Sequence, residues 1–297
     1  MIPTTLRAII DGALVFIASL PIRPQIRVLS GRCGLFSDVL VALNAIERCE
    51  ELGLSGSVHW GRRSLYFDPA IGGNAYEYFF SNSGFGKSRR NSHSFFLPYV
   101  PAGDTYSGSG LPNSTPRQHL KQLIDRFARP REEILGEVQT FMNQHLHGAR
   151  ILGVHVRRTD AVRGWEDRRV QPVSNFVNAA ERWISGHPDW LVFLATDADD
   201  VVADFKGRLG SRVVVQNALR SEDGRSLHGH HDEGTHGSPS RKGKEALIDA
   251  LILSRCDFLI RCFSFLTAYS LCFNPSLPFL DLDKLNLGVV RTRWLHE

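Results

Sequence analysis

The sequence lacks a paired-cysteine motif, a membrane-length apolar run and a long basic run. Its five cysteines form no CxxC pair, and an odd, sparse count is typical of reduced thiols in a reducing compartment. The apolar segment 13–20, with Asp11 at its edge, is far shorter than the ~20 residues that a spanning helix needs. No small-residue cleavage site precedes Pro21, so we expect a cytoplasmic protein with an N-terminal helix and no transmembrane segment.

Positive charge is present, but only in short clusters. The net charge is +4 over 297 residues. A nucleic-acid groove needs a continuous basic face, whereas isolated arginine pairs suit a phosphate-bearing small molecule. We therefore expect no nucleic-acid partner. The pairs are Arg62-Arg63, Arg89-Arg90, Arg157-Arg158 and Arg168-Arg169.

The residue pattern predicts strands that alternate with helices. In the first half, strand 26–29, a glycine-bearing turn at 30–34, helix 35–52 and strand 57–60 form the opening of a βαβ unit, before a loop-rich stretch at 67–116. In the second half, the predicted strands are 150–156, 190–195, 213–215 and 257–260. The predicted helices are 117–147 broken at Pro130, 174–185 with Ser174 as N-cap, 199–209, 244–256 and 267–273.

This alternation predicts the fold class. Short strands separated by helices require a parallel, doubly wound sheet with helices on both faces. A chain of 297 residues is too long for one comfortable core, so we predict two α/β domains, 1–149 and 150–297, with the boundary near Ala149. Two such domains form a cleft, and ligands bind outside the carboxyl ends of parallel strands.

The stretch ILGVHVRRTD, residues 151–160, is a buried-looking strand that ends in two adjacent arginines. Arginine is always charged and presents a planar fork of donors that suits bidentate phosphate contacts. Asp160 follows closely and would orient one guanidinium. The alternative is a structural Arg–Asp pair at a strand end, which contributes little to stability. Because the pair falls at the ligand-binding edge of a predicted sheet, we favour a phosphate site.

The motif HVRRTD, residues 155–160, resembles the hallmark of the α1,6-fucosyltransferases, in the superfamily that includes nodulation fucosyltransferases and protein O-fucosyltransferases. Three further stretches resemble that family in the same order. They are FLATD at 193–197, the helix-to-strand segment ALIDALILSRCDFLI at 246–260, and CFS at 262–264. The resemblance covers roughly residues 150–270, and its specificity lies in the combination of motifs.

The resemblance implies a GT-B arrangement, with two Rossmann-like doubly wound domains facing a cleft. It also implies a GDP-fucose donor, a glycan or glycoconjugate acceptor, inversion at the sugar carbon, and neither metal nor cofactor. Carried over by motif, the site residues are Arg157 at the β-phosphate, His155 at the guanine or its ribose, Asp249 at the guanine, Ser264 beside the phosphates, and Arg158, Asp160 and Asp197 as orienting or structural groups.

The chemistry of such a transfer agrees with this set of residues. A leaving nucleoside diphosphate gains negative charge, which arginine and backbone or hydroxyl donors would meet in the absence of a metal. Transfer to a hydroxyl usually needs a general base. Glu166 resembles the family's candidate, although it is equally read as one solvated acid beside Asp167. The turn at 30–34 resembles the family's first-domain loop, where glycines let backbone amides approach a ligand, and Arg32 would reach the donor across the cleft.

Two positions depart from the family pattern, and one cluster invites a metal assignment. Ala198 replaces a second aspartate and Phe265 a second serine. These departures keep open a non-catalytic nucleotide- or glycan-binding module, or a transferase that uses another nucleotide sugar. The histidine-rich stretch 228–236 lies in a Gly/Ser-rich loop without a rigid frame for zinc, so we predict a solvated lid instead.

Overall fold

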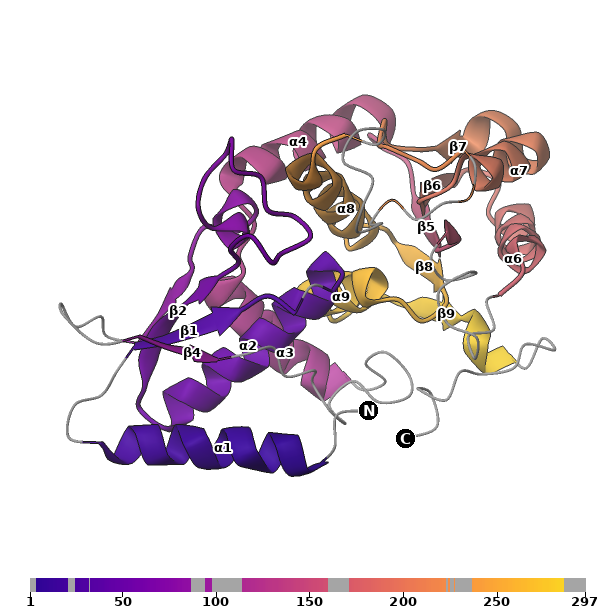
Figure 1. The fold of residues 1–297 in the computed structure, drawn as a ribbon. Helices are drawn as coiled ribbons and strands as arrows, with labels where there is room; N and C mark the ends of the chain where they lie inside the picture. Colours follow the sequence, from indigo (N-terminus) through magenta and orange to yellow (C-terminus); the bar gives the residue numbers. More distant parts are fainter. Residues whose placement is uncertain are drawn as a thin grey trace.

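The computed structural model describes residues 4–20, 25–31, 33–86, 94–97, 114–159, 171–222, 224, 227 and 237–285. They form two separate sheets rich in parallel strands (Figure 1). The first has the order β3-β2-β1-β4 and the second the order β7-β6-β5-β8-β9. The chain is therefore an α/β protein, as its alternating pattern predicts.

The first sheet is built around β1, which pairs in parallel with β2 and β4, while β3 is antiparallel to β2. The strands are β1 (Gln25–Leu29), β2 (Ser55–His59), β3 (Gly84–Phe85) and β4 (Ser94–Leu97). The helical elements of this half are α1 (Thr4–Ser19), α2 (Leu35–Glu51) and the short 3-10 turn η1 (Ala75–Tyr78). Gly53, with φ 65°, follows α2 in the left-handed conformation that glycine favours.

The second sheet is parallel throughout. Its strands are β5 (Ile151–Val156), β6 (Leu191–Thr196), β7 (Val213–Val214), β8 (Phe258–Arg261) and β9 (Phe279–Asp281). The helices around it are α4 (Glu132–His145), α6 (Val173–Gly186), α7 (Asp199–Leu209), α8 (Pro239–Leu253) and α9 (Phe265–Phe273), with 3-10 turns η3 (Gly210–Arg212) and η4 (Leu282–Leu285). Helix α3 (Ser114–Phe127) packs against α2 and α9 instead.

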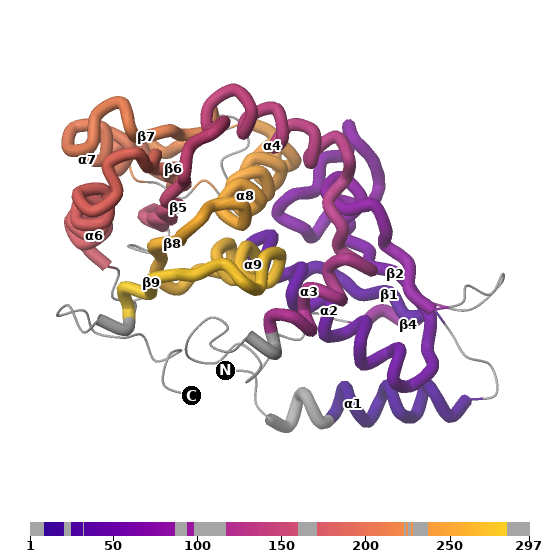
Figure 2. Tube along the Cα trace, turned by 180° about the vertical axis from the view of Figure 1, so that it is seen from behind, coloured from indigo at the N-terminus to yellow at the C-terminus, as the bar shows by residue number. Residues whose placement is uncertain are grey.

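Alternate residues of the central strands face two different cores. Ile151 and Phe193 belong to a large core that also holds α2, α8 and α9, whereas their neighbours Leu152 and Val192 face a second core under α6 and α7. The ribbon view and the tube view both show α8 and α9 between the two sheets (Figure 1 and Figure 2). One core therefore runs across the predicted boundary at Ala149, which stays a prediction.

Glycine allows the closest of these contacts. A Cβ at Gly243 of α8 would lie 2.5 Å from the Phe79 ring and 2.8 Å from that of Tyr66, both in the first half. A Cβ at Gly153 of β5 would lie 2.9 Å from the Cys256 sulfur, just beyond α8. Helix α8 thus packs closely against the second sheet on one side and against the first half of the chain on the other.

Several predicted boundaries are wrong for local reasons. The helix predicted at 244–256 begins at Pro239, because Ser238 accepts the backbone N–H of Arg241 as an N-cap and proline fits the first turn. The N-cap of α6 is Pro172, not Ser174. The stretch 67–116, predicted as loop, contributes η1, β3 and β4, and strand β9 was not predicted. Each of these four elements is short.

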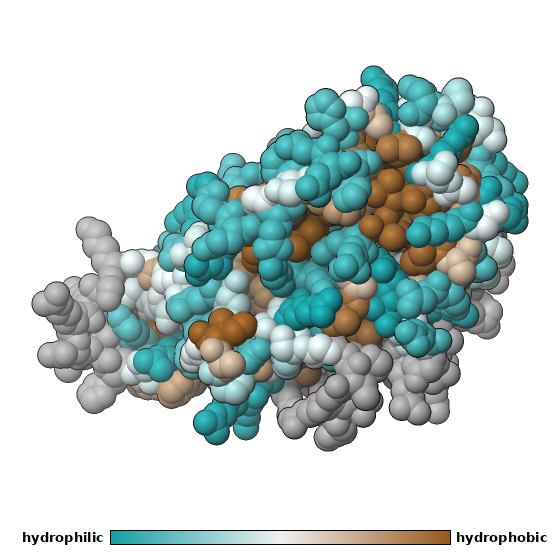
Figure 3. All heavy atoms as spheres, turned by 90° about the horizontal axis from the view of Figure 1, so that it is seen from above, coloured by the Kyte–Doolittle hydropathy of each residue, from teal (hydrophilic) through white to brown (hydrophobic). Residues whose placement is uncertain are grey.

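The described surface is mainly hydrophilic when viewed from above, with apolar side chains gathered towards the second half (Figure 3). Within the described ranges, no helix combines the length and apolarity needed to cross a membrane.

Candidate functional site

Strand register brings the predicted motifs to one edge of the second sheet. Val156 at the end of β5 pairs with Thr196 at the end of β6, and Val154 pairs with Ile260 of β8. Arg157, Asp197 and the turn before α9 therefore follow neighbouring strands at the same level. This carboxyl edge is where open parallel sheets bind ligands.

Asp197 shapes the turn that carries the arginine pair. Its Oδ1 accepts the backbone N–H of Arg158 at 2.9 Å, and its Oδ2 accepts the Thr159 hydroxyl at 2.7 Å and backbone N–H at 3.3 Å. Asp200, at the start of α7, accepts a hydrogen bond from Arg158 Nε at 3.2 Å. The Arg158 side chain is thus held towards α7. Arg157, the first charged residue beyond the strand, is half-buried.

His155 is buried in a positively charged surrounding. Burial, with the charges of Arg157 and Arg261, lowers the pKa of His155 to about 3. Its Nδ1 is buried and has no hydrogen-bond partner in the structure. A neutral imidazole with an unmet nitrogen offers a polar contact to a ligand without adding charge. Arg261 itself is fully buried, 3.8 Å from the Asp281 carboxylate.

Asp249 is a buried carboxyl on α8. The Gln216 side-chain amide is oriented so that its oxygen and its nitrogen both have suitable hydrogen-bond partners. In this orientation the Gln216 nitrogen donates to Asp249 Oδ1 at 2.7 Å. Burial is the main cause that raises the pKa of Asp249 to about 7, with Glu245 adding to the rise and Arg220 opposing it. Gln216 leaves the second carboxylate oxygen available to accept further donors.

Ser264 caps α9, and Asp283 fixes the turn before it. The Ser264 hydroxyl accepts the Leu266 backbone N–H at 3.3 Å, which leaves its own hydrogen to donate. Asp283 accepts the backbone N–H of Phe263 at 2.8 Å and the Gln171 amide at 3.2 Å. At the next position, Phe265 packs against Phe263 with ring centroids 5.4 Å apart.

The glycine-bearing turn of the first half approaches this edge. It follows β1 at the carboxyl end of the first sheet, and Figure 1 shows it beside α9. Phe36, just inside α2, packs against Tyr269 of α9 with ring centroids 5.0 Å apart. The two halves therefore meet where α2 packs against α9.

Sequence reasoning named Asp197, Asp249, His155, Arg157, Arg158 and Ser264, and each lies at the carboxyl edge or on the helix beside it. It missed Asp200, Gln216, Arg261 and Asp283, which support those residues. The spacing of Asp200 from Asp197 was the one available signal, because the roles of the others depend on contacts between segments that are distant in the sequence. Three named residues, Arg32, Asp160 and Glu166, and the histidine-rich stretch 228–236 lie outside the described residues.

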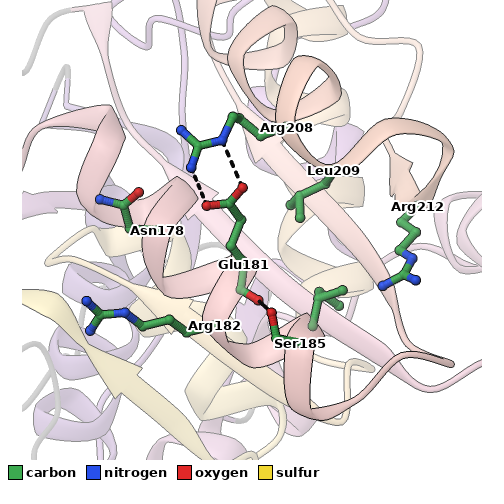
Figure 4. Close-up of a pocket in the computed structure, with 8 residues that line it drawn as sticks. Asn178, Glu181, Arg182, Ser185, Arg208, Leu209 and Arg212 are labelled. Atoms are coloured by element: carbon green, nitrogen blue, oxygen red, sulfur yellow. Dashed lines mark hydrogen bonds and ion pairs between the residues drawn. The ribbon is translucent and has the colours of Figure 1, made fainter.

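Other features of the described residues do not join this edge. No group of three or more His, Cys, Asp or Glu side chains there is arranged to hold a metal. The five cysteines, all within the described residues, form no disulfide, and burial raises the pKa of Cys49, Cys262 and Cys272 to about 12. A groove of about 840 Å³ between α6 and α7 holds Arg182, Arg208 and Arg212, with Glu181 paired to Arg208 (Figure 4).

Comparison with known proteins agrees with this architecture. The profile of the Nodulation protein Z (NodZ) family matches residues 116–291. Nodulation protein Z of Sinorhizobium fredii (strain NBRC 101917 / NGR234) is 28% identical over 187 residues, which are 59% of this chain and 56% of that protein. The match thus spans little more than half of that relative's length.

Solved structures share the fold at low identity. A NodZ alpha-1,6-fucosyltransferase co-crystallized with GDP superposes with a TM-score of 0.55 at 19% identity, covering 88% of this chain and 96% of that one. Fucosyltransferase NodZ from Bradyrhizobium gives 0.54 at 19%, covering 89% and 97%. POFUT1 in complex with GDP gives 0.50 at 11%, covering 86% and 98%.

Two parallel-rich α/β halves that pack against each other through α2, α8 and α9, together with the likeness to the NodZ and POFUT1 structures, define the GT-B class of fold. Within that class, the family profile covers more than half of the sequence, including every motif of the second sheet. The chain belongs to the Nodulation protein Z family.

Proposed function

We propose that this chain transfers fucose from GDP-fucose to a hydroxyl group of a glycan or glycoconjugate, with inversion at the sugar carbon and without a metal. The observation that carries the proposal is the position of Arg157, directly after β5 and beside buried, neutral His155, in a member of this family. Relatives of this fold include a NodZ alpha-1,6-fucosyltransferase soaked with GDP-fucose.

The proposed donor contacts follow the edge of the second sheet. Arg157 would hold the β-phosphate, and the Ser264 hydroxyl would donate to a phosphate oxygen. His155 and Asp249 would contact the nucleoside, with the Asp249 oxygen not used by Gln216 accepting from the guanine. Their burial supports this assignment, because displacing water strengthens polar contacts to a ligand.

Supporting residues would keep these groups in place. Asp197 would hold the backbone after β5 through its bonds to Arg158 and Thr159. Arg158 would serve as an orienting group, since Asp200 pairs with its side chain. Asp160 would assist the arginines, and Arg32 would reach the donor from the first half.

The proposed reaction forms a bond from the acceptor oxygen to the sugar carbon as the bond from that carbon to the GDP oxygen breaks. The electron pair of the broken bond leaves with GDP, and Arg157 would stabilise the developing charge. Glu166 would take the proton from the acceptor hydroxyl as general base. Attack opposite the leaving group would give inversion.

Cytoplasmic location remains a prediction from the cysteine pattern.

Incubation of the purified protein with GDP-fucose tests the function. We expect a rise in melting temperature and slow release of fucose by donor hydrolysis. A rise without hydrolysis would instead support a nucleotide-binding module. Neither effect with GDP-fucose, but both with another nucleotide sugar, would identify a different donor.

A further inference from the structure

Asp38 is a buried carboxyl of the first half that the proposed donor contacts do not use. It lies in the first turn of α2 and is 2% exposed. Its carboxylate accepts the Ser30 hydroxyl at 2.5 Å and the Gly31 backbone N–H at 3.2 Å, and also the backbone N–H of Cys33. Burying a carboxylate is costly unless hydrogen bonds replace those that it made with water, and these three bonds do so.

These bonds turn the backbone donors of the glycine-bearing turn inward. Gly31 and Cys33 donate to Asp38, and Leu35 N–H, the first backbone donor of α2, donates to the Tyr66 hydroxyl at 2.8 Å. The expectation that amides of this turn approach an anion therefore does not hold for Gly31 and Cys33. Asp38 and Tyr66 occupy the inner side of the turn.

The turn is also tied to the second half of the protein. Tyr66 is so close to α8 that a Cβ on Gly243 would lie 2.8 Å from its ring. Phe36 packs against Tyr269 of α9, the helix that begins after Ser264. A change in the shape of the turn would thus shift α8 and α9, the two helices that border the proposed donor site.

We infer that Asp38 is a positioning residue for the donor: by holding Ser30, Gly31 and Cys33, it sets the shape of the first-half turn that closes the donor site. This inference rests on the proposed function, because that function supplies the donor. Asp38 itself touches neither substrate nor the reacting atoms. Burial, opposed by these hydrogen bonds, raises the pKa of Asp38 to about 6, so its carboxylate form prevails at neutral pH.

The test compares Asp38→Asn and Ser30→Ala with a matched control, Asp11→Asn. Asp11 is a partly exposed carboxyl that pairs with Arg48 between α1 and α2, away from the turn. Two properties are measured: hydrogen exchange of the Gly31 and Cys33 amides, and the KM and kcat of GDP-fucose hydrolysis. The asparagine presents an NH2 group to the turn's donors, so it cannot accept all three bonds.

For Asp38→Asn, we expect amide exchange at both positions and the KM for GDP-fucose each to rise about tenfold, as the loss of one or two hydrogen bonds predicts. We expect kcat to stay within about twofold, because the groups that meet the leaving charge are untouched. Ser30→Ala should shift the same two properties in the same direction by less, and Asp11→Asn should shift neither.

Faster exchange with an unchanged KM would overturn the inference, since Asp38 would then be structural only. A higher KM with unchanged exchange would also overturn it, because the turn would not be what Asp38 positions. If Asp38→Asn does not fold, the same readouts on Ser30→Ala decide. If the wild type does not use GDP-fucose at all, the proposed function fails, and amide exchange alone then decides whether Asp38 holds the turn.

Discussion

Replacing Asp249 with asparagine should stabilise the fold at alkaline pH and at the same time weaken donor binding. Asp249 is buried, and its pKa is about 7 in the folded protein compared with an ordinary value of 3.8. Between these values the folded chain binds more protons than the unfolded chain, so the free energy of unfolding falls as pH rises.

The size of this effect follows from the two pKa values. They differ by about three, and each pKa unit is worth 1.36 kcal/mol, so ionising Asp249 costs the folded state about 4 kcal/mol above pH 7. Asparagine has the same shape, keeps an oxygen for the Gln216 amide and does not ionise. The variant should match the wild type near pH 3, exceed its unfolding free energy by about 1.6 kcal/mol at pH 5, and exceed it by about 4 kcal/mol at pH 8.5.

Urea unfolding at a series of pH values checks the predicted gain in stability. The control is Asp204→Asn, an exposed carboxyl on α7, which should leave the pH dependence unchanged. Calorimetric titration with GDP checks the predicted loss of donor binding, since the variant should lose affinity for GDP while it gains stability. Parallel stability curves for Asp249→Asn and the wild type would refute the reasoning, because the buried carboxyl would then not titrate as its surroundings require.

Three further predictions concern the strands of the same sheet. Asp197→Ala removes the acceptor of the Arg158 and Thr159 backbone bonds, so the KM for GDP-fucose should rise at least tenfold, as measured by donor hydrolysis. Gly153→Ala should lower the unfolding free energy in urea by about 1–3 kcal/mol, because its Cβ overlaps the residues that end α8. His155 has a lowered pKa, so its contribution to stability should fall as pH drops from 6.5 towards 3. His155→Gln should make acid unfolding less steep over that interval.

The elements predicted best were those with long apolar periodicity or fully buried strands. Helix 35–52 and strand 150–156 differ from α2 and β5 by one residue at an end, because each buries a continuous apolar set. The two-residue β3 and the three-residue β9 carry too few residues to show a period. Exposed Phe95 and Phe96 in β4 also hide the alternation that marks a half-buried strand.

The candidate site divides in the same way. Arg157 and Asp197 were predictable because each directly follows a strand, and the carboxyl ends of parallel strands lie at the same edge of a sheet. Gln216 and Asp283 were not, since their roles depend on loops folding back onto α8 and onto the turn before α9. Asp38 lies in the first turn of the predicted helix 35–52, but its burial and its hydrogen bonds to the preceding turn are properties of three-dimensional packing.

Calorimetric titration of GDP-fucose into the wild type and Arg157→Ala tests the central claim most directly. We expect the wild type to bind and the variant to lose at least about 2 kcal/mol of binding free energy, as the loss of charge-assisted phosphate contacts requires. Arg182→Ala, in the groove between α6 and α7, is the matched control and should bind as the wild type does. Equal affinity in Arg157→Ala and the wild type would contradict a donor site at the carboxyl edge of the second sheet.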